Sequence, residues 1–267
     1  MIYAKHGFLI RYLYLLIAIG YWSINKILFT KNINSVVLCY HGVKPEQKKA
    51  FTEQVKSLVR KDNSPPPNNN SHTPVLFTFD DAFANLLENA LLVLVENGLA
   101  PMVFVVTGNL AQMPNWNMPQ NHPEKNEITM TADQIKSAFQ KGLCRFGSHT
   151  HTHANLSELS DEKLKNELAD SKKLLEGLLQ TQIVDLALPH GDYNQKVLEY
   201  AKQIGYKYIY TLEPHVNPKI LYPGKVGRFS MSPDIWPIEF KLTCAGAYAW
   251  LHPWRRSINW VRKQLFS

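Results

Sequence analysis

Cysteine is scarce in this chain of 267 residues, and its three cysteines, Cys39, Cys144 and Cys244, are widely separated. No CxxC pair occurs, which argues against a structural zinc knuckle and against a thioredoxin-like redox motif. An odd number of isolated thiols also indicates that no disulfide framework holds the fold. We therefore expect the three side chains to pack as small hydrophobic groups.

Acidic residues are also few, with 22 Asp and Glu against 29 Lys and Arg, so the net charge is +7. A basic balance favours an anionic partner such as nucleic acid, an acidic glycan or an anionic lipid surface, without choosing among them. The composition, 45% hydrophobic and 19% charged, is ordinary for a globular protein and argues against global disorder. The length suffices for one α/β barrel or two small domains.

Long apolar runs are missing as well. The most hydrophobic segment, residues 8–29, has an unbroken apolar core only from Leu13 to Ile19, and Arg11 and Lys26 flank it. A membrane-spanning helix needs about 20 apolar residues, and no small-residue cleavage site of a signal peptide follows. Three interpretations of residues 1–34 stay open: a membrane anchor, an interfacial amphipathic helix, or a helix buried on the domain.

The other end of the chain, residues 251–267, is a basic tail rich in tryptophan. Tryptophan beside arginine suits the headgroup boundary of a membrane, although a final helix packed on the domain would show the same pattern. We expect a membrane-associated protein of the cell envelope, held at the inner membrane by one N-terminal anchor or peripherally. Only this tail offers a basic stripe with stacking aromatics, so we expect no nucleic-acid partner. The sequence predicts neither the side of the membrane nor the oligomeric state.

Between these ends, residues 35–250 alternate predicted strands with predicted helices, which indicates a parallel sheet in one catalytic α/β domain. About seven strands are countable, which favours a distorted (β/α) barrel over an open sheet. The predicted strands are residues 35–40, 75–78, 102–107, 145–148, 183–188, 206–211 and 225–230. The predicted helices are residues 51–61, 83–97, 131–141, 160–179 and 195–204.

Two short motifs at predicted strand ends carry metal-binding residue types. The run VLFTFDD closes on the adjacent carboxylates Asp80 and Asp81, and GSHTHTH contains His149 and His153, four residues apart. An Asp and two neutral imidazoles with an open position form a ligand set of catalytic zinc-type sites. The second Asp would be free for acid–base work, so the pattern predicts metal-assisted hydrolysis.

These motifs, with four further segments, resemble the polysaccharide deacetylase (NodB-homology) family, carbohydrate esterase family four. TFDD is similar to the first family motif, HTHTH to the second, and LALPHG stands where the third falls. The resemblance extends through YHGV, ELADSKKLLE and IGYKYIYT, and spans roughly residues 36–246. It implies a barrel of the NodB-homology type and a divalent metal, with zinc as the default and iron, cobalt or nickel as alternatives.

The resemblance implies a role for each matched residue. Asp80 would be the general base that activates water, and Asp81, His149 and His153 would bind the metal. His41 of the YH motif would protonate the leaving amine, as in a subgroup with this N-terminal order. Its competitor is His252, which stands near the C-terminus.

Three positions depart from the family pattern. Ala82 replaces the Gly that usually follows the Asp pair, Ala187 replaces an Arg before the prolines of the third motif, and His190 replaces its Tyr. The base is thereby left without its usual Arg partner, which Arg228 or Asp234 could replace. The resemblance also places Pro189, His190 and Arg228 near the substrate, with a backbone N–H near His190 as the oxyanion donor.

The function that the resemblance implies is removal of N-acetyl groups from amino sugars of the N-acetylglucosamine type, in a polysaccharide or glycolipid. An O-acetyl esterase acting on a glycan would need the same site and stays open. A noncatalytic glycan- or membrane-binding module on the same fold is the alternative from another class. The intact Asp80, Asp81, His149 and His153 argue against it, because a binding module needs no free carboxylate beside a metal.

Overall fold

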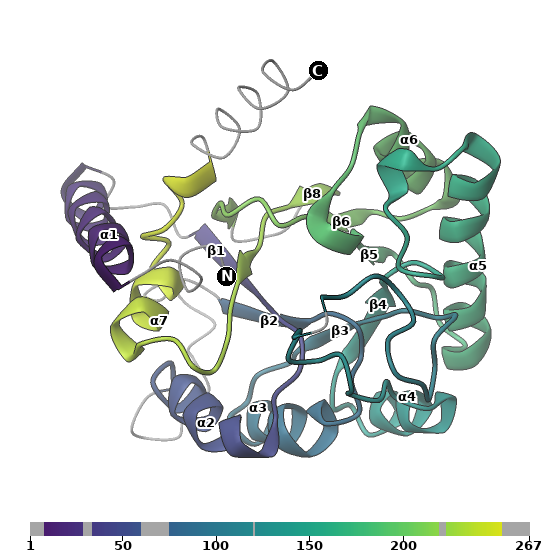
Figure 1. The fold of residues 1–267 in the computed structure, drawn as a ribbon, viewed down its shortest axis with the longest axis horizontal. Helices are drawn as coiled ribbons and strands as arrows, with labels where there is room; N and C mark the ends of the chain where they lie inside the picture. The colour runs from purple at the N-terminus through teal and green to yellow at the C-terminus, as the bar shows by residue number, and fades with distance from the viewer. Residues whose placement is uncertain (1–7, 29–33, 60–74, 120, 219–222, 253–267) are drawn as a thin grey trace.

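A ring of parallel strands forms the centre of the molecule, and helices surround it (Figure 1). The computed structural model describes residues 8–28, 34–59, 75–119, 121–218 and 223–252. The sheet has nine strands, in the order β7-β1-β2-β3-β4-β5-β6-β8, with β9 paired to β1. The strands are β1 (Asn34–Tyr40), β2 (Val75–Phe79), β3 (Met102–Val105), β4 (Arg145–Ser148), β5 (Asp185–Ala187), β6 (Tyr208–Tyr210), β7 (Asn217–Pro218), β8 (Gly224–Val226) and β9 (Phe229–Ser230).

All pairings in this sheet are parallel except that of β7 with β1. The prediction of an α/β barrel built from about seven parallel strands is confirmed. One predicted strand, residues 225–230, is divided at Gly227 and Arg228 into β8 and β9. Because β8 pairs with β6 and β9 pairs with β1, this broken strand brings the two ends of the sheet together.

The helices cover the outside of the barrel, and α2 to α6 follow one another around it (Figure 1). Thr131 and Ser160 cap α4 and α5, each accepting a hydrogen bond from a backbone N–H in the first turn. The α-helices are α1 (Phe8–Leu28), α2 (Lys48–Lys56), α3 (Leu92–Glu96), α4 (Ala132–Gln140), α5 (Asp161–Leu179), α6 (Gln195–Ile204) and α7 (Pro237–Cys244). Short turns of other helical types are η1 (Pro45–Gln47), η2 (Leu87–Leu91), η3 (Leu156–Glu158) and η4 (Pro189–Gly191).

Two predicted helices differ from those observed. The helix expected at residues 51–61 begins three residues earlier and ends at Lys56. The helix expected at residues 83–97 starts later, because residues 81–85 form turns at the end of β2, and its first part is the π-helical turn η2. Only the second difference lies at a strand end, where the turns after β2 delay the helix.

Alternate residues of the strands face two different cores. In β1, Val36 and Leu38 belong to the large core between the sheet and the helices, whereas Val37 belongs to a small core inside the barrel. The small core also contains Met102 and Phe104 of β3, Ala187 of β5, Tyr210 of β6 and Val226 of β8. Gly147 makes room there, because a Cβ at this residue would lie 2.6 Å from the Phe104 ring. The barrel interior is therefore filled rather than open.

The N-terminal helix α1 lies beside α7 (Figure 1). Arg11 pairs with the buried carboxylate of Glu239 through two hydrogen bonds, and its guanidinium lies 3.8 Å from the centre of the Trp236 ring. Among the described residues, no helix combines the length and the hydrophobicity required to cross a membrane. Most of the predicted basic tail, from residue 253 onward, lies outside the described residues.

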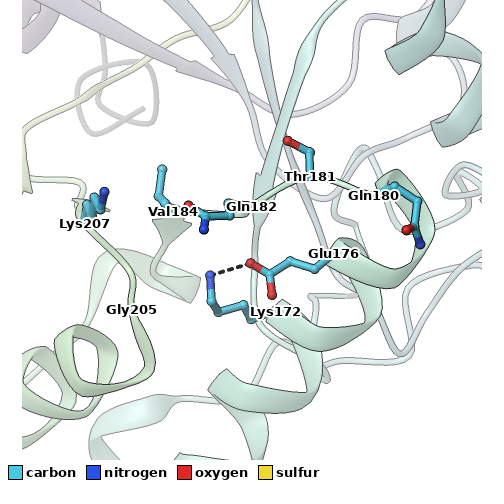
Figure 2. A pocket seen from close by; sticks show the side chains of 8 residues that line it. All are labelled: Lys172, Glu176, Gln180, Thr181, Gln182, Val184, Gly205 and Lys207. Carbon is cyan, nitrogen blue, oxygen red and sulfur yellow. Dashed lines mark hydrogen bonds and ion pairs between the residues drawn. The ribbon is translucent and has the colours of Figure 1, made fainter.

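A hollow of about 570 Å³ opens at the end of the barrel where β5 and β6 begin (Figure 2). Lys172 and Glu176 of α5 form an ion pair at its edge, 2.8 Å apart. The other residues around it come from the turns that lead into β5 and β6, and none is a predicted site residue. Size alone therefore does not identify the functional end of this barrel.

Arg228, in the break between β8 and β9, turns its side chain into the barrel and is fully buried. Its guanidinium donates to both carboxylate oxygens of Asp80, at 2.6 and 3.0 Å, and to Thr78 Oγ1 at 3.3 Å. Its Nε donates to the carbonyl of Thr211 at 3.2 Å, and the group lies 5.4 Å from the centre of the Phe104 ring. The closing strand is thus joined to β2 through a buried ion pair.

Substituting Arg228→Met should lower the free energy of unfolding by about 3–5 kcal/mol, because it leaves the buried Asp80 carboxylate without its cation. The double variant Arg228→Met/Asp80→Asn should lose less than the sum of the two single variants. Urea unfolding in the presence of a chelator measures both effects. The exposed Arg145→Met is the matched control and should change stability by less than about 0.5 kcal/mol. Strictly additive losses would contradict the coupling.

Candidate functional site

The predicted site residues meet at one end of the barrel because each follows the carboxyl end of a parallel strand. His41 follows β1, Asp80 and Asp81 follow β2, and His149 follows β4. The C-terminal ends of parallel barrel strands lie at the same face, and the loops there supply functional groups. His190 follows β5 in the turn η4, and Arg228 follows β8.

Asp81, His149 and His153 form a buried group of three possible metal ligands. The Nε2 atoms of His149 and His153 each lie 3.6 Å from Asp81 Oδ1. Tetrahedral zinc with ligands at its usual bond lengths places neighbouring ligand atoms about 3.3 Å apart. The three residues therefore fit a zinc-type cation.

Two further observations agree with a cation at this place. Asp81 Oδ1 is buried and has no hydrogen-bond partner in the described part of the chain. Burial, followed by the Asp80 carboxylate, holds the pKa of Asp81 well above its usual range, so this oxygen is poorly compensated by the protein alone. Burial lowers the pKa of His149 to about 4 and that of His153 to about 2, so both imidazoles are neutral, as metal ligands must be.

Hydrogen bonds orient the first histidine ligand and the loop that follows it. His149 Nδ1 lies 2.9 Å from the carbonyl of Ala187, and donation of its proton there leaves Nε2 free to bind a metal. Glu167 of α5 accepts hydrogen bonds from the backbone N–H and the hydroxyl of Thr152. The backbone N–H of His153 donates to Thr150 Oγ1 at 3.2 Å. The loop from His149 to His153 is thus held by a hydrogen bond within itself and by Glu167 of α5.

Asp80 lies beside this triad without belonging to it. Its Oδ2 is 3.8 Å from His149 Nε2, while both oxygens accept hydrogen bonds from Arg228. Burial alone would raise the pKa of Asp80, but the Arg228 guanidinium and then His149 outweigh it and hold this pKa below the usual range. The carboxylate is therefore anionic at neutral pH. Of the two residues expected as partners of Asp80, Arg228 is the one that contacts it, whereas Asp234 accepts hydrogen bonds from Gln47 and Ser232.

Cys39 was predicted to be an inert packing residue, and the structure shows a contact that the sequence did not reveal. All three cysteines are buried and free, but the Cys39 thiol donates to Asp80 Oδ2 at 3.3 Å. Burial raises the pKa of this thiol well above its usual range, so it stays protonated and can donate. Its position in the inward-facing alternation of β1, two residues after Val37, is the signal that could have identified it.

A pocket of about 210 Å³ opens over the triad and Asp80. His41, which is half-buried, and His190, which is exposed, contribute to its walls. The His190 ring contacts that of His153 edge to face, with 4.8 Å between centroids. Pro189 is buried beneath this turn and is not one of the residues that line the pocket.

Trp116 also lines the pocket, although no motif in the sequence marks it as a site residue. Its ring stacks on that of His153, with 4.7 Å between centroids and an angle of 27°. It comes from the irregular connection between β3 and α4, which also contributes Asn117 to Pro119 and His122 to the pocket. Long irregular connections in compact domains are often functional, and that length was the available signal.

His252, the alternative acid, is not among the residues that line this pocket. Its Nε2 lies 3.6 Å from a carboxylate oxygen of Glu213, and its ring contacts that of His215. The structure therefore brings together His41, Asp80, Asp81, His149 and His153, and it places His252 in a different cluster.

The comparisons with known proteins agree with this geometry. The family model for polysaccharide deacetylase matches residues 68–209, which is more than half of the chain. YxkH of Bacillus subtilis (strain 168), a relative that carries the name polysaccharide deacetylase, is 30% identical over 140 residues. The match covers 52% of this chain and 45% of the relative. A poly-beta-1,6-N-acetyl-D-glucosamine N-deacetylase of Staphylococcus aureus (strain MRSA252) is 26% identical over 147 residues, covering 52% and 48%. The chain thus spans about half the length of these curated relatives.

Two solved structures share the fold. The deacetylase PplD of Streptococcus pyogenes, in complex with acetate, has a TM-score of 0.63 at 21% identity, covering 80% of this chain and 99% of that one. IcaB of Ammonifex degensii has a TM-score of 0.58 at 22% identity, covering 80% and 98%. Because the family model matches more than half of the chain, this protein belongs to the polysaccharide deacetylase family.

Proposed function

We propose that this chain is a metal-dependent hydrolase that removes N-acetyl groups from amino sugars of the N-acetylglucosamine type, in a polysaccharide or glycolipid. The observation that carries the proposal is the Asp80 carboxylate, which is not one of the three possible metal ligands but lies beside Asp81, His149 and His153 in the same pocket. A site that only binds a cation does not need a second buried carboxylate held apart by an arginine. The N-deacetylase activity for which the Staphylococcus aureus relative is named supports the substrate class.

The triad would hold the metal through Asp81 Oδ1 and the Nε2 atoms of His149 and His153. When bound, a zinc-type cation polarises a carbonyl group and lowers the pKa of water towards neutrality. Iron, cobalt and nickel suit the same ligands. The protein's own contribution is that burial keeps both imidazoles neutral and that the Ala187 carbonyl orients His149.

Asp80 would act as the general base, accepting a proton from the water that attacks the acetyl carbonyl carbon. Arg228 keeps the carboxylate anionic, and together with the Cys39 thiol it fixes the direction of the group. Because the pKa of Asp80 is held below its usual range, the carboxylate is anionic at neutral pH and able to accept a proton.

His41 would be the general acid that protonates the nitrogen of the leaving amine as the carbon–nitrogen bond breaks. It lines the same pocket as Asp80, and burial lowers its pKa, which makes its protonated form a stronger acid. The products are acetate and an amino sugar. If His41 is the acid, the protein would belong to the subgroup with an N-terminal YH motif, and the position of His252 outside the pocket supports this proposal.

The reaction is tested by acetate release from N-acetylglucosamine oligomers and glycolipids, using full-length protein loaded with zinc. We expect release by the wild type, and a loss of at least about 10²-fold in Asp80→Asn with the metal content unchanged, because the variant removes the base and keeps all three metal ligands. Asp133→Asn on the exposed face of α4 is the matched control.

Each other outcome separates an alternative. Release only from O-acetylated glycans would replace the amidase with the O-acetyl esterase. A wild type that retains zinc but releases no acetate from either class would favour the glycan-binding module.

The role of His41 is tested by comparing two substrates whose leaving groups differ in their need for a proton. His41→Ala should reduce acetate release from N-acetylglucosamine oligomers by about 10²–10⁴-fold, because an amine must be protonated to leave. Hydrolysis of p-nitrophenyl acetate should fall far less, because its phenolate leaves without a proton. The same two substrates should also be tested with His252→Ala, because His252 is the alternative candidate for the acid. A selective loss of amide hydrolysis in His252→Ala, and none in His41→Ala, would reverse the assignment.

A membrane-surface role is favoured by α1. Leu9, Leu13 and Leu16, spaced along one side of this helix, are 84%, 57% and 64% exposed, and Ile24 is 58% exposed. The opposite side is occupied, because Leu15 and Ala18 are buried and Arg11 pairs with Glu239. A helix lying at the lipid boundary has this arrangement, and the net charge of +7 suits an anionic surface.

The interfacial role predicts binding to phosphatidylglycerol-containing vesicles in a co-sedimentation assay, weaker on phosphatidylcholine alone. Replacing Leu9, Leu13 and Leu16 with Ser should abolish most of the binding, because it removes the apolar area that enters the lipid. A matched control replaces Leu92, Ile128 and Leu174, which are exposed on other parts of the described surface. Equal binding by both triple variants would show that α1 is not the lipid-binding helix.

A further inference from the structure

A second group of possible metal ligands lies outside the candidate active site. It consists of Glu213, His215 and His252, whose ligand atoms all lie within 4.8 Å of one another. Glu213 and His215 stand in the loop that follows β6, and His252 stands in the chain beyond α7. The group shares no residue with the triad of the active site, and none of its members lines the active-site pocket.

The geometry of this group resembles that of the buried triad. The rings of His215 and His252 have centroids 5.1 Å apart and an interplanar angle of 75°, compared with 4.9 Å and 73° for His149 and His153. His252 Nε2 lies 3.6 Å from Glu213 Oε2, the same separation as between each imidazole and Asp81 Oδ1. Two imidazoles and one carboxylate with room for another ligand form a catalytic-type zinc set.

The surrounding residues hold the carboxylate ligand in place. The Tyr193 hydroxyl donates to Glu213 Oε1 at 2.8 Å, which leaves Oε2 directed towards His252. The backbone N–H groups of His215 and Arg228 both donate to the carbonyl of Glu213, at 2.9 and 3.1 Å. Support of this kind orients metal ligands in proteins.

His215 is seated against the closing strand of the barrel. A Cβ on Gly227 would lie 2.4 Å from its ring, so only glycine at this position admits the imidazole. The Asn217 side chain fixes that backbone, because it bonds both the N–H and the carbonyl of Gly227 at 2.9 Å. His215 Nδ1 is buried and finds no hydrogen-bond partner in the part of the chain that the structure describes. A buried imidazole nitrogen without a hydrogen-bond partner destabilises the fold unless the ring binds a ligand.

We propose that Glu213, His215 and His252 bind a second divalent cation of the zinc class, which fastens the chain after α7 to the loop after β6. All three residues are half-buried, so solvent can supply the remaining ligands. The inference does not depend on the deacetylase reaction, because the cation would have a structural role. Lys225 Nζ, 3.5 Å from Glu213 Oε2 and 2.8 Å from the Tyr193 hydroxyl, is the cation that competes for the site.

The experiment counts zinc per chain in the full-length protein by mass spectrometry of the metal, after exchange against a weak chelator. The wild type should hold two equivalents, and His215→Gln/His252→Gln should hold one. A variant that removes the active-site ligands, Asp81→Asn/His149→Gln/His153→Gln, should also hold one, and zinc should still raise its melting temperature. Lys225→Met should bind the second equivalent several-fold more tightly, because it removes the competing charge.

Cobalt absorption in the active-site variant gives an independent readout of imidazole and carboxylate ligands. The proposal is overturned if the wild type holds one equivalent and the active-site variant holds none. It is also overturned if His215→Gln/His252→Gln retains two equivalents while keeping its melting temperature in chelator. A wild-type protein that holds two equivalents of zinc but has no deacetylase activity would count against the proposed function alone.

Discussion

One buried ion pair, between Arg228 and Asp80, determines both how this barrel closes and how its site is arranged. A guanidinium inside a barrel must be paired, and Asp80 is the carboxylate that both of its terminal nitrogens contact. Arg228 lies between β8 and β9, at the point where the last strand is divided in two. The residue that pairs with Asp80 therefore lies where the sheet closes, so one contact links the closing strand to the site.

The loops above this ion pair hold backbone conformations that would be unfavourable elsewhere. Asp81, Ala82, Thr150, His153 and His190 all have positive φ, between 53° and 69°. Such conformations in non-glycine residues persist only where the surroundings enforce them, and they gather at functional sites. Here the enforcing contacts include Glu167 on Thr152 and the Ala187 carbonyl on His149. Helix α5 and strand β5 thus hold the geometry that the loops alone could not keep.

The sequence predicted the barrel and the approximate place of most strands, because buried parallel strands appear as short apolar runs between helices. It also predicted the convergence of Asp81, His149 and His153, since residues after parallel strands meet at one face. What it missed depends on contacts between distant segments. Trp116 stacks on His153 from a connection without regular pattern, and the Cys39 thiol reaches Asp80 from the neighbouring strand. The alternation of β1 places Cys39 on the inner face of the barrel, but no pattern in the sequence names Asp80 or His153 as the partner of either contact.

The three departures from the family pattern become intelligible when the contacts are considered together. Ala82 adopts a φ of 53°, so the position still has the conformation that suits glycine, with a buried methyl group added. Ala187 contributes only its backbone carbonyl to His149, which any residue could supply. Arg228, which lies between β8 and β9 where the barrel closes, provides a guanidinium for Asp80 from a distant segment of the chain. Under the proposed function it would take the place of the Arg that the family pattern has before the prolines of the third motif, and a comparison made motif by motif does not reveal such a replacement.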